Sequence, residues 1–256
     1  MSMLVAGNSH LVGFKEAADA RGAPFGYVPV PLCTNFEDAV KSGSGHFALE
    51  TGWGNMKSAI GSKQVDLRYD FSQPERELTF VGMKLFGCFP IFGTLISPVM
   101  ARLFPIWPCA GTGTIPAHRK YQIVSQSCLK QVFVAELGAA IAEYSWLFEK
   151  FDKVTWIPSP PPSEKFAESK FLPEHRWFIK SGLHAAYLST FNECLERVND
   201  SDPARSTGIR FVPHPMQCID PETGFLRPEF ARDPATPEDT HASAKYFQEV
   251  SALIAD

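Results

Sequence analysis

The sequence predicts a single α/β domain in which a parallel sheet lies between two layers of helices, a three-layer α/β/α sandwich. Two observations carry this prediction. Short apolar runs alternate with longer segments of helical periodicity over most of the chain. One of these runs, Leu78–Leu85, is apolar on both faces, which is typical of a strand covered by helices on each side. A length of 256 residues is ordinary for one domain of this class, so residues 1–256 are treated as one unit.

The N-terminal part begins with a strand, a turn and a helix. Met3–Ala6 is a short apolar run, and His10–Ala20 follows with helical spacing and stops near Gly22, as helices often do at a glycine. Phe25–Val30 is predicted to be the next strand. Pro31–Pro74 is predicted to be mostly loop, because several glycines interrupt it: Gly43, Gly45, Gly52 and Gly54.

The C-terminal half continues the alternation. Val154–Ile157 and Ile209–Val212 are predicted strands, and Pro173–Val198 and His241–Ala255 are predicted helices. Tyr121–Phe151 is the longest predicted helix. Its apolar residues recur at close to helical spacing, at Val124, Cys128, Val132, Leu137, Ile141, Tyr144 and Phe148.

The segment Leu85–Ala117 does not fit this alternation. It is rich in Phe, Ile, Leu, Trp and Pro, and Arg102 is its only charged residue. Prolines and glycines would break a membrane-spanning helix repeatedly: Pro90, Pro98, Pro105, Pro108, Gly87 and Gly93. We therefore expect no membrane span but an apolar, proline-rich insertion on the domain surface. Such an insertion could cover a site, contact an acyl chain, form a homo-oligomer interface or associate with a membrane.

Composition excludes several classes of partner. The formal net charge is -4 and there is no block of Lys or Arg, so nothing favours nucleic acid or anionic lipid. The N-terminus has no basic leader, which makes the cytoplasm the expected location. The six cysteines form no C-x-x-C pair, so neither a zinc site nor a disulfide framework is expected. No metal or other cofactor is predicted, and five histidines attract no function: His46, His118, His175, His184 and His214.

A polar cluster, Gly7-Asn8-Ser9-His10, follows the first predicted strand. Open parallel sheets bind ligands at the carboxyl ends of their strands, so the cluster lies where a site is expected. A serine at the entrance to a helix can present its hydroxyl above the sheet, while its own N–H points where an oxyanion forms. The alternative is that Ser9 or Asn8 only caps the helix, which is the commoner role of such residues.

A second polar cluster, Glu238-Asp239-Thr240-His241, begins the last predicted helix. In a doubly wound sheet, the loop before this cluster can return over the carboxyl edge and bring His241 to Ser9. A serine nucleophile needs an imidazole to take its proton, and the imidazole needs a carboxylate on its other nitrogen. Glu238 and Asp239 are the candidates for that carboxylate, although an acidic helix start is also a common structural feature.

Together these motifs resemble the SGNH, or GDSL-like, hydrolase family. In that family a G-D-S or G-N-S turn follows the first strand, an Asp-x-x-His pair lies near the C-terminus, and the fold is a flavodoxin-like α/β/α sandwich. Gly7-Asn8-Ser9-His10 is similar to the first block, and Glu238-Asp239-Thr240-His241 to the last. The stretches Val81–Gly87 and Ile157–Pro161 also look like segments of bacterial relatives. The resemblance therefore spans the whole chain.

The resemblance implies roles for particular residues. Ser9 would be the nucleophile and His241 its base, with Glu238 at the family's Asp position and Asp239 as the alternative carboxylate. The oxyanion and substrate would meet backbone and side-chain groups of the connecting loops: Asn8, His10, Gly52, Asn55 and Gly82. The family's usual oxyanion Asn is missing from Gly82-Met83-Lys84, and Asn55 is a substitute only if it is not simply a turn residue.

The expected activity is hydrolysis of a small ester through an acyl-enzyme, with transfer to an acceptor other than water left open. An O-acetylated carbohydrate is suggested as the substrate by family analogy alone. The alternative from another class is a catalytically weak or inactive protein of the same fold that binds a sugar or glycoconjugate. The missing oxyanion Asn is the main support for that alternative.

Overall fold

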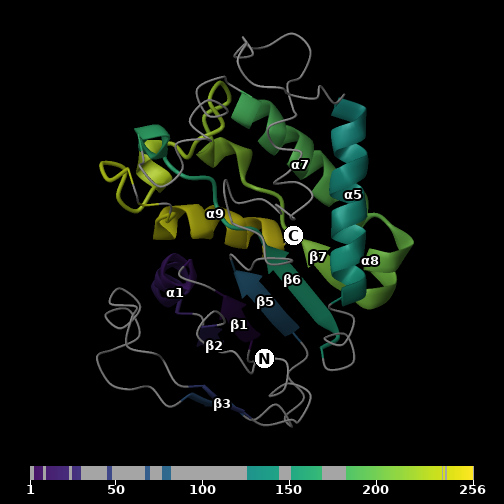
Figure 1. Cartoon of the computed structure of the whole chain (residues 1–256). Coiled ribbons are helices and arrows are strands. Elements are labelled where there is room, and N and C mark those ends of the chain that lie inside the picture. The colour runs from purple at the N-terminus through teal and green to yellow at the C-terminus, as the bar shows by residue number, and fades with distance from the viewer. Residues whose placement is uncertain are drawn as a thin grey trace.

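The chain forms a mixed α/β structure in which a parallel sheet packs against helices, which confirms the α/β class and the parallel sheet of the prediction (Figure 1). The computed structural model describes part of the chain. The described residues are 3–7, 10–22, 25–29, 45–47, 67–69, 77–81, 126–143, 151–168, 183–237, 239 and 241–255. The predicted insertion at 85–117 lies outside these residues.

The sheet contains all the predicted strands. Its members are β1 (Met3–Gly7), β2 (Phe25–Pro29), β5 (Glu77–Val81), β6 (Lys153–Ile157) and β7 (Ile209–Phe211). They lie in the order β2-β1-β5-β6-β7, and every neighbouring pair is parallel. The order reverses beside β1, so β2 and β5 lie on opposite sides of the first strand. A topological switch of this kind is where open parallel sheets bind ligands.

Four longer helices flank the sheet: α1 (Leu11–Ala20), α5 (Gln126–Glu143), α7 (Leu183–Asn199) and α9 (Ala244–Ala255). Shorter elements complete the described structure. These are α8 (Asp202–Thr207), the 3-10 turns η4 (Glu164–Glu168), η6 (Met216–Cys218) and η7 (Pro228–Phe230), and a small antiparallel pair, β3 (Gly45–Phe47) with β4 (Leu67–Tyr69). Gly45, expected to break structure, is thus the first residue of a strand.

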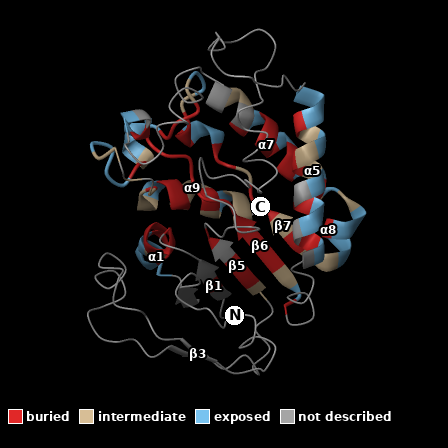
Figure 2. Ribbon diagram, viewed as in Figure 1, coloured by how far each residue is buried: buried red, intermediate tan, exposed pale blue. Residues whose placement is uncertain are grey.

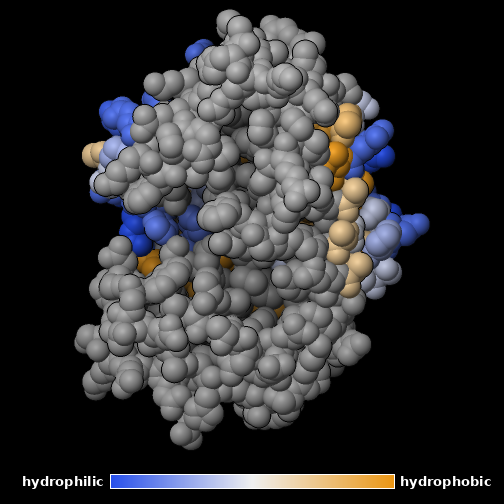
Figure 3. Space-filling view, in the orientation of Figure 1, coloured by the Kyte–Doolittle hydropathy of each residue, from blue (hydrophilic) through white to orange (hydrophobic). Residues whose placement is uncertain are grey.

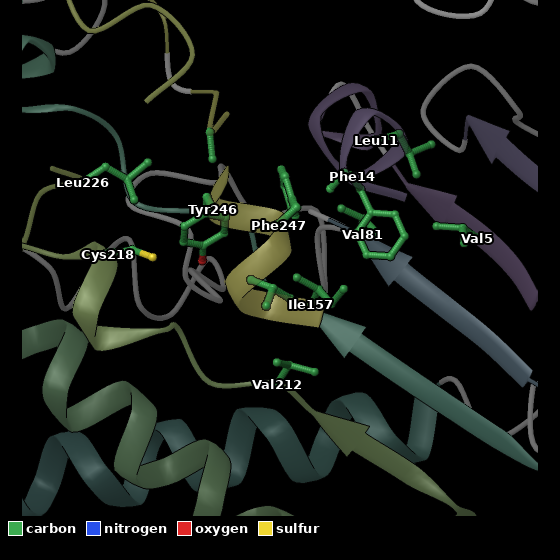
Figure 4. Packing of buried hydrophobic residues seen from close by; sticks show 13 residues of the cluster. Val5, Leu11, Phe14, Val81, Ile157, Val212, Cys218, Leu226, Tyr246 and Phe247 are labelled. Carbon is green, nitrogen blue, oxygen red and sulfur yellow. The ribbon is translucent and has the colours of Figure 1, made fainter. Parts of the chain in front are cut away.

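One face of the sheet is covered by α1 and α9. Val5, Val81 and Ile157 come from three neighbouring strands and belong to one buried cluster with side chains of both helices (Figure 4). The ring of Phe14 from α1 meets that of Phe247 from α9 edge-on, at 5.9 Å between centroids. This cluster therefore joins the first strand and helix to the last helix.

On the opposite face, α7 contacts β7 and α5 packs against α7, and Figure 2 shows buried residues along the strands and the inner sides of these helices. Trp156 and Phe211 lie on neighbouring strands with their rings 6.1 Å apart, and both are buried. The α5 and α7 helices contact each other through Phe133 and Phe191, with 5.3 Å between ring centroids. Burying large rings of this kind is the main favourable contribution to such a core.

Two asparagines hold α7 against the chain at and after β7. The side-chain amide of Asn199 donates to the carbonyl of Phe211 at 2.7 Å and accepts from its N–H at 2.7 Å. Two helical turns earlier, Asn192 pairs in the same way with the N–H and carbonyl of His214, at 3.0 and 2.9 Å. The path of the chain from residue 211 to residue 214 is thereby fixed.

The buried stripe of α5 agrees with the predicted one at Leu137 and Ile141 and differs from it at the start of the helix. Leu129, Phe133, Leu137 and Ile141 are buried at four-residue spacing, whereas Cys128 is exposed. The helix carries apolar residues around its whole circumference, so periodicity alone did not select the inward side. Figure 3 shows apolar surface along the side of the molecule where α5 lies. None of the described helices is both long and apolar enough to cross a membrane.

The last helix begins later than predicted, at Ala244 rather than at His241. Just before it, Ala242 forms an isolated antiparallel bridge with Ala231. Because backbone groups of the 241–243 segment bond across to residues 230 and 232, they cannot also join a helix. The polar cluster around His241 is therefore part of a loop and not a helix start.

The first helix approaches this loop very closely at Gly13. A Cβ at position 13 would lie 2.8 Å from the carbonyl oxygen of Ala242 and 2.8 Å from the ring of Phe247. Real Cβ atoms do not come this near to other heavy atoms, so only glycine allows α1 and α9 to pack at this distance. Gly13 thus sets the separation of the two chain ends.

We expect Gly13→Ala to destabilise the protein by about 1–3 kcal/mol, because the clash outweighs the better helix propensity of alanine. Gly138→Ala in α5 is the matched control, since a Cβ there meets nothing within 4 Å. That variant should gain up to about 1 kcal/mol. Urea unfolding of both variants measures the difference, and equal stabilisation of the two would show that α1 and α9 do not pack this closely.

Candidate functional site

The candidate site lies at the carboxyl edge of the sheet, where β1, β5 and β6 end together. Their last residues, Gly7, Val81 and Ile157, are paired in register. His10 stands three residues beyond β1, at the N-cap position of α1. The parallel topology therefore directs the chain after β1 to the edge at which ligands bind.

His241 is carried to this edge by a closed loop of residues 230–243. The N–H of Arg232 donates to the carbonyl of His241 at 2.9 Å, and the N–H of Ser243 donates to the carbonyl of Phe230 at 2.8 Å. The side chain of Arg232 extends from the loop and pairs with Glu16 of α1 at 3.6 Å. Backbone hydrogen bonds thus join the two ends of the loop, and an ion pair links the loop to the first helix.

Asp239 orients the imidazole of His241 from two residues away. Its Oδ1 accepts the backbone N–H of His241 at 2.9 Å and also contacts Nδ1 of the same residue at 2.5 Å. The first bond is an Asx turn, in which an aspartate side chain caps the backbone two residues on. One carboxylate oxygen therefore fixes both the backbone and the ring, and the opposite ring nitrogen, Nε2, faces away from Asp239.

The ring of His241 lies against the ring of His10. Their centroids are 5.0 Å apart and their planes are tilted by 47°. His10 is buried, with 5% of its surface exposed, whereas 30% of the His241 side chain is exposed. The first turn after β1 and the loop before α9 thus meet through two histidines.

The imidazole of His10 has a strongly altered pKa. Burial, together with the nearby His241, lowers the pKa of His10 from its usual 6.5 to about 3, although Asp239 acts in the opposite direction. Two charged rings at this separation would repel by about 3 kcal/mol at an effective dielectric constant of about 20. His10 is therefore neutral at ordinary pH.

The Asp239 carboxylate stays ionised. Burial tends to raise its pKa, but the hydrogen bonds from the His241 side chain and backbone, the charge of His241 and the charge of Arg232 outweigh burial and lower it. An ionised carboxylate on Nδ1 is the arrangement that lets an imidazole accept a proton at Nε2. Arg232 and Glu16 were not singled out in the sequence, because a pair so far apart in the chain leaves no local pattern.

Of the predicted site residues, the structure describes His10, Asp239 and His241 and brings these three together. Predictions about the others lie outside the described residues: Asn8, Ser9, Gly52, Asn55, Gly82 and Glu238. Family spacing favoured Glu238 as the partner of His241, whereas the carboxylate observed on Nδ1 belongs to Asp239. The Asp-x-His spacing of an Asx turn is the local signal that points to this partner.

A second buried histidine has a structural role. His214 follows β7, and its Nδ1 lies 2.9 Å from the hydroxyl of Tyr246 in α9. Burial, with a smaller effect of Cys218, raises the pKa of Tyr246 well above its usual value, so the phenol stays protonated. The pair therefore anchors α9 over the end of β7, as expected for a hydrogen-bonded core histidine.

A pocket of about 360 Å³ opens beside the loop that carries His241. Apolar residues, among them Phe225, Leu226 and Pro234, share its lining with Ser163, Lys165 and Arg227. Its charges are compensated, since Lys165 pairs with Glu168 at 2.9 Å and Arg227 lies in the field of Asp220. Of the candidate catalytic residues that the structure describes, neither Asp239 nor His241 lines this pocket.

Within the described parts of the chain, no three His, Cys, Asp or Glu side chains group in a way that could hold a metal ion. Comparison with protein-family models, with curated proteins and with solved structures found no match to this chain.

The burial of His10 predicts acid sensitivity. An unfolded chain binds a proton at His10 below about pH 6.5, but the folded state excludes that proton until about pH 3. The free energy of unfolding should therefore fall as pH falls through this window, by up to about 1.4 kcal/mol per pH unit.

His10→Phe removes this group and should flatten the dependence by that amount. The test is urea unfolding of wild type and variant from pH 7 to pH 4, with the slopes compared and not the absolute stabilities. Asp239 has the same sign of effect but loses its contribution at lower pH, as its own lowered pKa is approached. Parallel curves for the two proteins would mean that His10 is not a buried neutral group.

Proposed function

We propose that this protein is a serine ester hydrolase in which Ser9 is the nucleophile, His241 the general base and Asp239 the carboxylate that orients the base. One observation carries the proposal. The Asp239–His241 pair, joined at 2.5 Å, packs against His10, which directly follows Ser9 in the chain. A carboxylate, an imidazole and a serine are the three groups that nucleophilic acyl transfer requires.

The topology supports the same reading. Counting only strands of the main sheet, their order is second, first, third, fourth and fifth, which is the flavodoxin-like doubly wound order. Helices α1 and α9 pack on one face and α5 and α7 on the other. We infer from this that the domain is a three-layer sandwich of the SGNH hydrolase type. A fold does not specify a reaction, so the activity rests on the side chains.

In the proposed reaction, Nε2 of His241 takes the proton of the Ser9 hydroxyl as its oxygen attacks the ester carbonyl. The positive charge that then forms on His241 is stabilised by Asp239 at Nδ1. His241 returns the proton to the leaving alcohol, and an acyl-enzyme results. Water, activated in turn by His241, attacks the acyl carbon and releases the acid and free Ser9.

Backbone N–H groups of Ser9 and Gly82, with Gly52 or Asn55 from the second loop, are the proposed oxyanion donors. The absence of an Asn in Gly82-Met83-Lys84 implies the loss of one donor, which costs roughly a hundredfold to a thousandfold in kcat. We therefore propose a slow or specialised esterase for a small ester. An O-acetylated carbohydrate is one such substrate.

The same missing donor favours a second candidate, a binding protein of this fold for a sugar or glycoconjugate. In that case Ser9 and His241 would hydrogen-bond a hydroxyl-rich ligand without reacting. The two candidates differ in one respect, since only an esterase has a Ser9 hydroxyl that an electrophile can capture.

An organophosphorus serine probe should therefore label the wild type at Ser9, as located by mass spectrometry of peptides. Ser9→Ala should lose both the label and the esterase activity on a generic acetyl ester. His241→Ala should be about as damaging, because the members of a catalytic unit do not act additively. Intact esterase activity in Ser9→Ala would exclude this nucleophile, and an unlabelled wild type that binds sugars would favour the second candidate.

The partner of His241 is tested by a matched pair of neighbouring variants. Asp239→Asn removes the negative charge at Nδ1 and should lower kcat by roughly a hundredfold to ten-thousandfold while the fold survives. Glu238→Gln changes the adjacent carboxylate in the same way and should have a much smaller effect. Both are assayed beside the wild type on the acetyl ester. The reverse ranking would assign the role to Glu238, as the family spacing suggests.

A further inference from the structure

His10 lies at a capping position of a helix, but its side chain does not cap the helix. It stands at the N-cap of α1, where Ser, Thr, Asp or Asn normally accepts a hydrogen bond from the first turn. The His10 side chain makes no capping bond, and its backbone is already helical, with φ -71° and ψ -15°. Helix formation therefore does not account for a histidine at this position.

Burial of this imidazole is also unfavourable for a titratable group, since it excludes the charged form. The ring lies against the side chain of His241, at 5.0 Å between centroids. Asp239, which is bonded to Nδ1 of His241, also acts electrostatically on His10, and the Arg232–Glu16 pair ties the loop that carries His241 to α1. His241 is thus held between a carboxylate and a buried flat ring.

We propose that His10 is a positioning residue whose buried ring holds the imidazole of His241 so that Nδ1 stays on Asp239. The proposal rests on the proposed function only for its effect on turnover. The ring of His241 is partly exposed and could rotate about its side-chain bonds if only one hydrogen bond held it. Contact with a second, immobile ring restricts that rotation and keeps Nε2 directed away from Asp239.

A positively charged residue at position 10 would disfavour protonation of His241, and an empty space would let its ring turn. A neutral ring avoids both effects. The role therefore requires the flat shape and neutrality of the His10 side chain, and Phe should replace it. Leu fills the space without a planar surface, and Ala leaves it empty.

The tautomer of His241 is the direct readout. In protein with ¹⁵N-labelled histidine, long-range ¹H–¹⁵N spectra at about pH 8.5, where an ordinary imidazole is neutral, distinguish a proton on Nδ1 from one on Nε2. We expect the Nδ1–H form of His241 in the wild type and in His10→Phe. We expect a mixture of both forms in His10→Ala and His10→Leu. Asp239→Ala provides the control in which the Nδ1 partner is absent.

Turnover of the acetyl ester gives the second readout. His10→Ala and His10→Leu should lower kcat by about tenfold to a hundredfold with KM little changed, because the base is misplaced and the substrate is not. His10→Phe should lower kcat much less than these two variants do. If His10→Ala does not fold, as judged by its thermal unfolding, the comparison of Leu with Phe decides the matter.

The proposal is overturned if His10→Leu and His10→Ala keep the Nδ1–H form, or if His10→Phe loses it as they do. The second result would assign the effect to the nitrogen atoms of His10 and not to its ring. A wild type without esterase activity would contradict the proposed function. It would leave the tautomer experiment intact, so the two failures are distinguishable.

Discussion

The close approach of α1 to the loop before α9 is the constraint on which the candidate site depends. Residues near the N-terminus and residues near the C-terminus meet there, with Gly13 against the carbonyl of Ala242. A larger side chain at position 13 would push the two segments apart, and the His10 and His241 rings would separate with them. The shared cluster of Val5, Phe14 and Phe247 then holds the arrangement on the sheet. The chemistry therefore depends on packing between parts of the chain that are adjacent only in the folded state.

Much of the fold follows from local sequence patterns. The apolar runs that became β1, β6 and β7 are short and bounded by turns, and their alternation with helices was sufficient to predict a parallel sheet. Predictions from local patterns were wrong where one segment is compatible with more than one structure. The α5 sequence is apolar on several sides, so the inward stripe was determined by the α7 surface that it meets. The start of α9 was misplaced because a backbone bridge between Ala231 and Ala242 competes with the helix.

The candidate site was predictable in part, and the reasons are physical. A polar turn after the first strand and a histidine near the end of the chain indicate a reactive site, because their residue types can react and the sheet topology can bring them together. The partner of that histidine depends on local backbone geometry, since an Asx turn brings the carboxylate of Asp239 onto the ring two residues away. Family spacing suggested Glu238 because a motif match compares only sequence positions and takes no account of the turn geometry. The burial of His10 arises from long-range packing, so no pattern within the first helix predicts it.

The asparagine at the end of α7 has a consequence for behaviour in solution. β7 is the last strand in the sheet order, and its neighbour β6 bonds to only one of its sides. The N–H and carbonyl of Phe211, which would otherwise be available to another chain, are both occupied by the side-chain amide of Asn199. An unpaired strand edge is a template for intermolecular pairing. A single amide side chain thus occupies, at this border of the sheet, two backbone groups through which another strand could add.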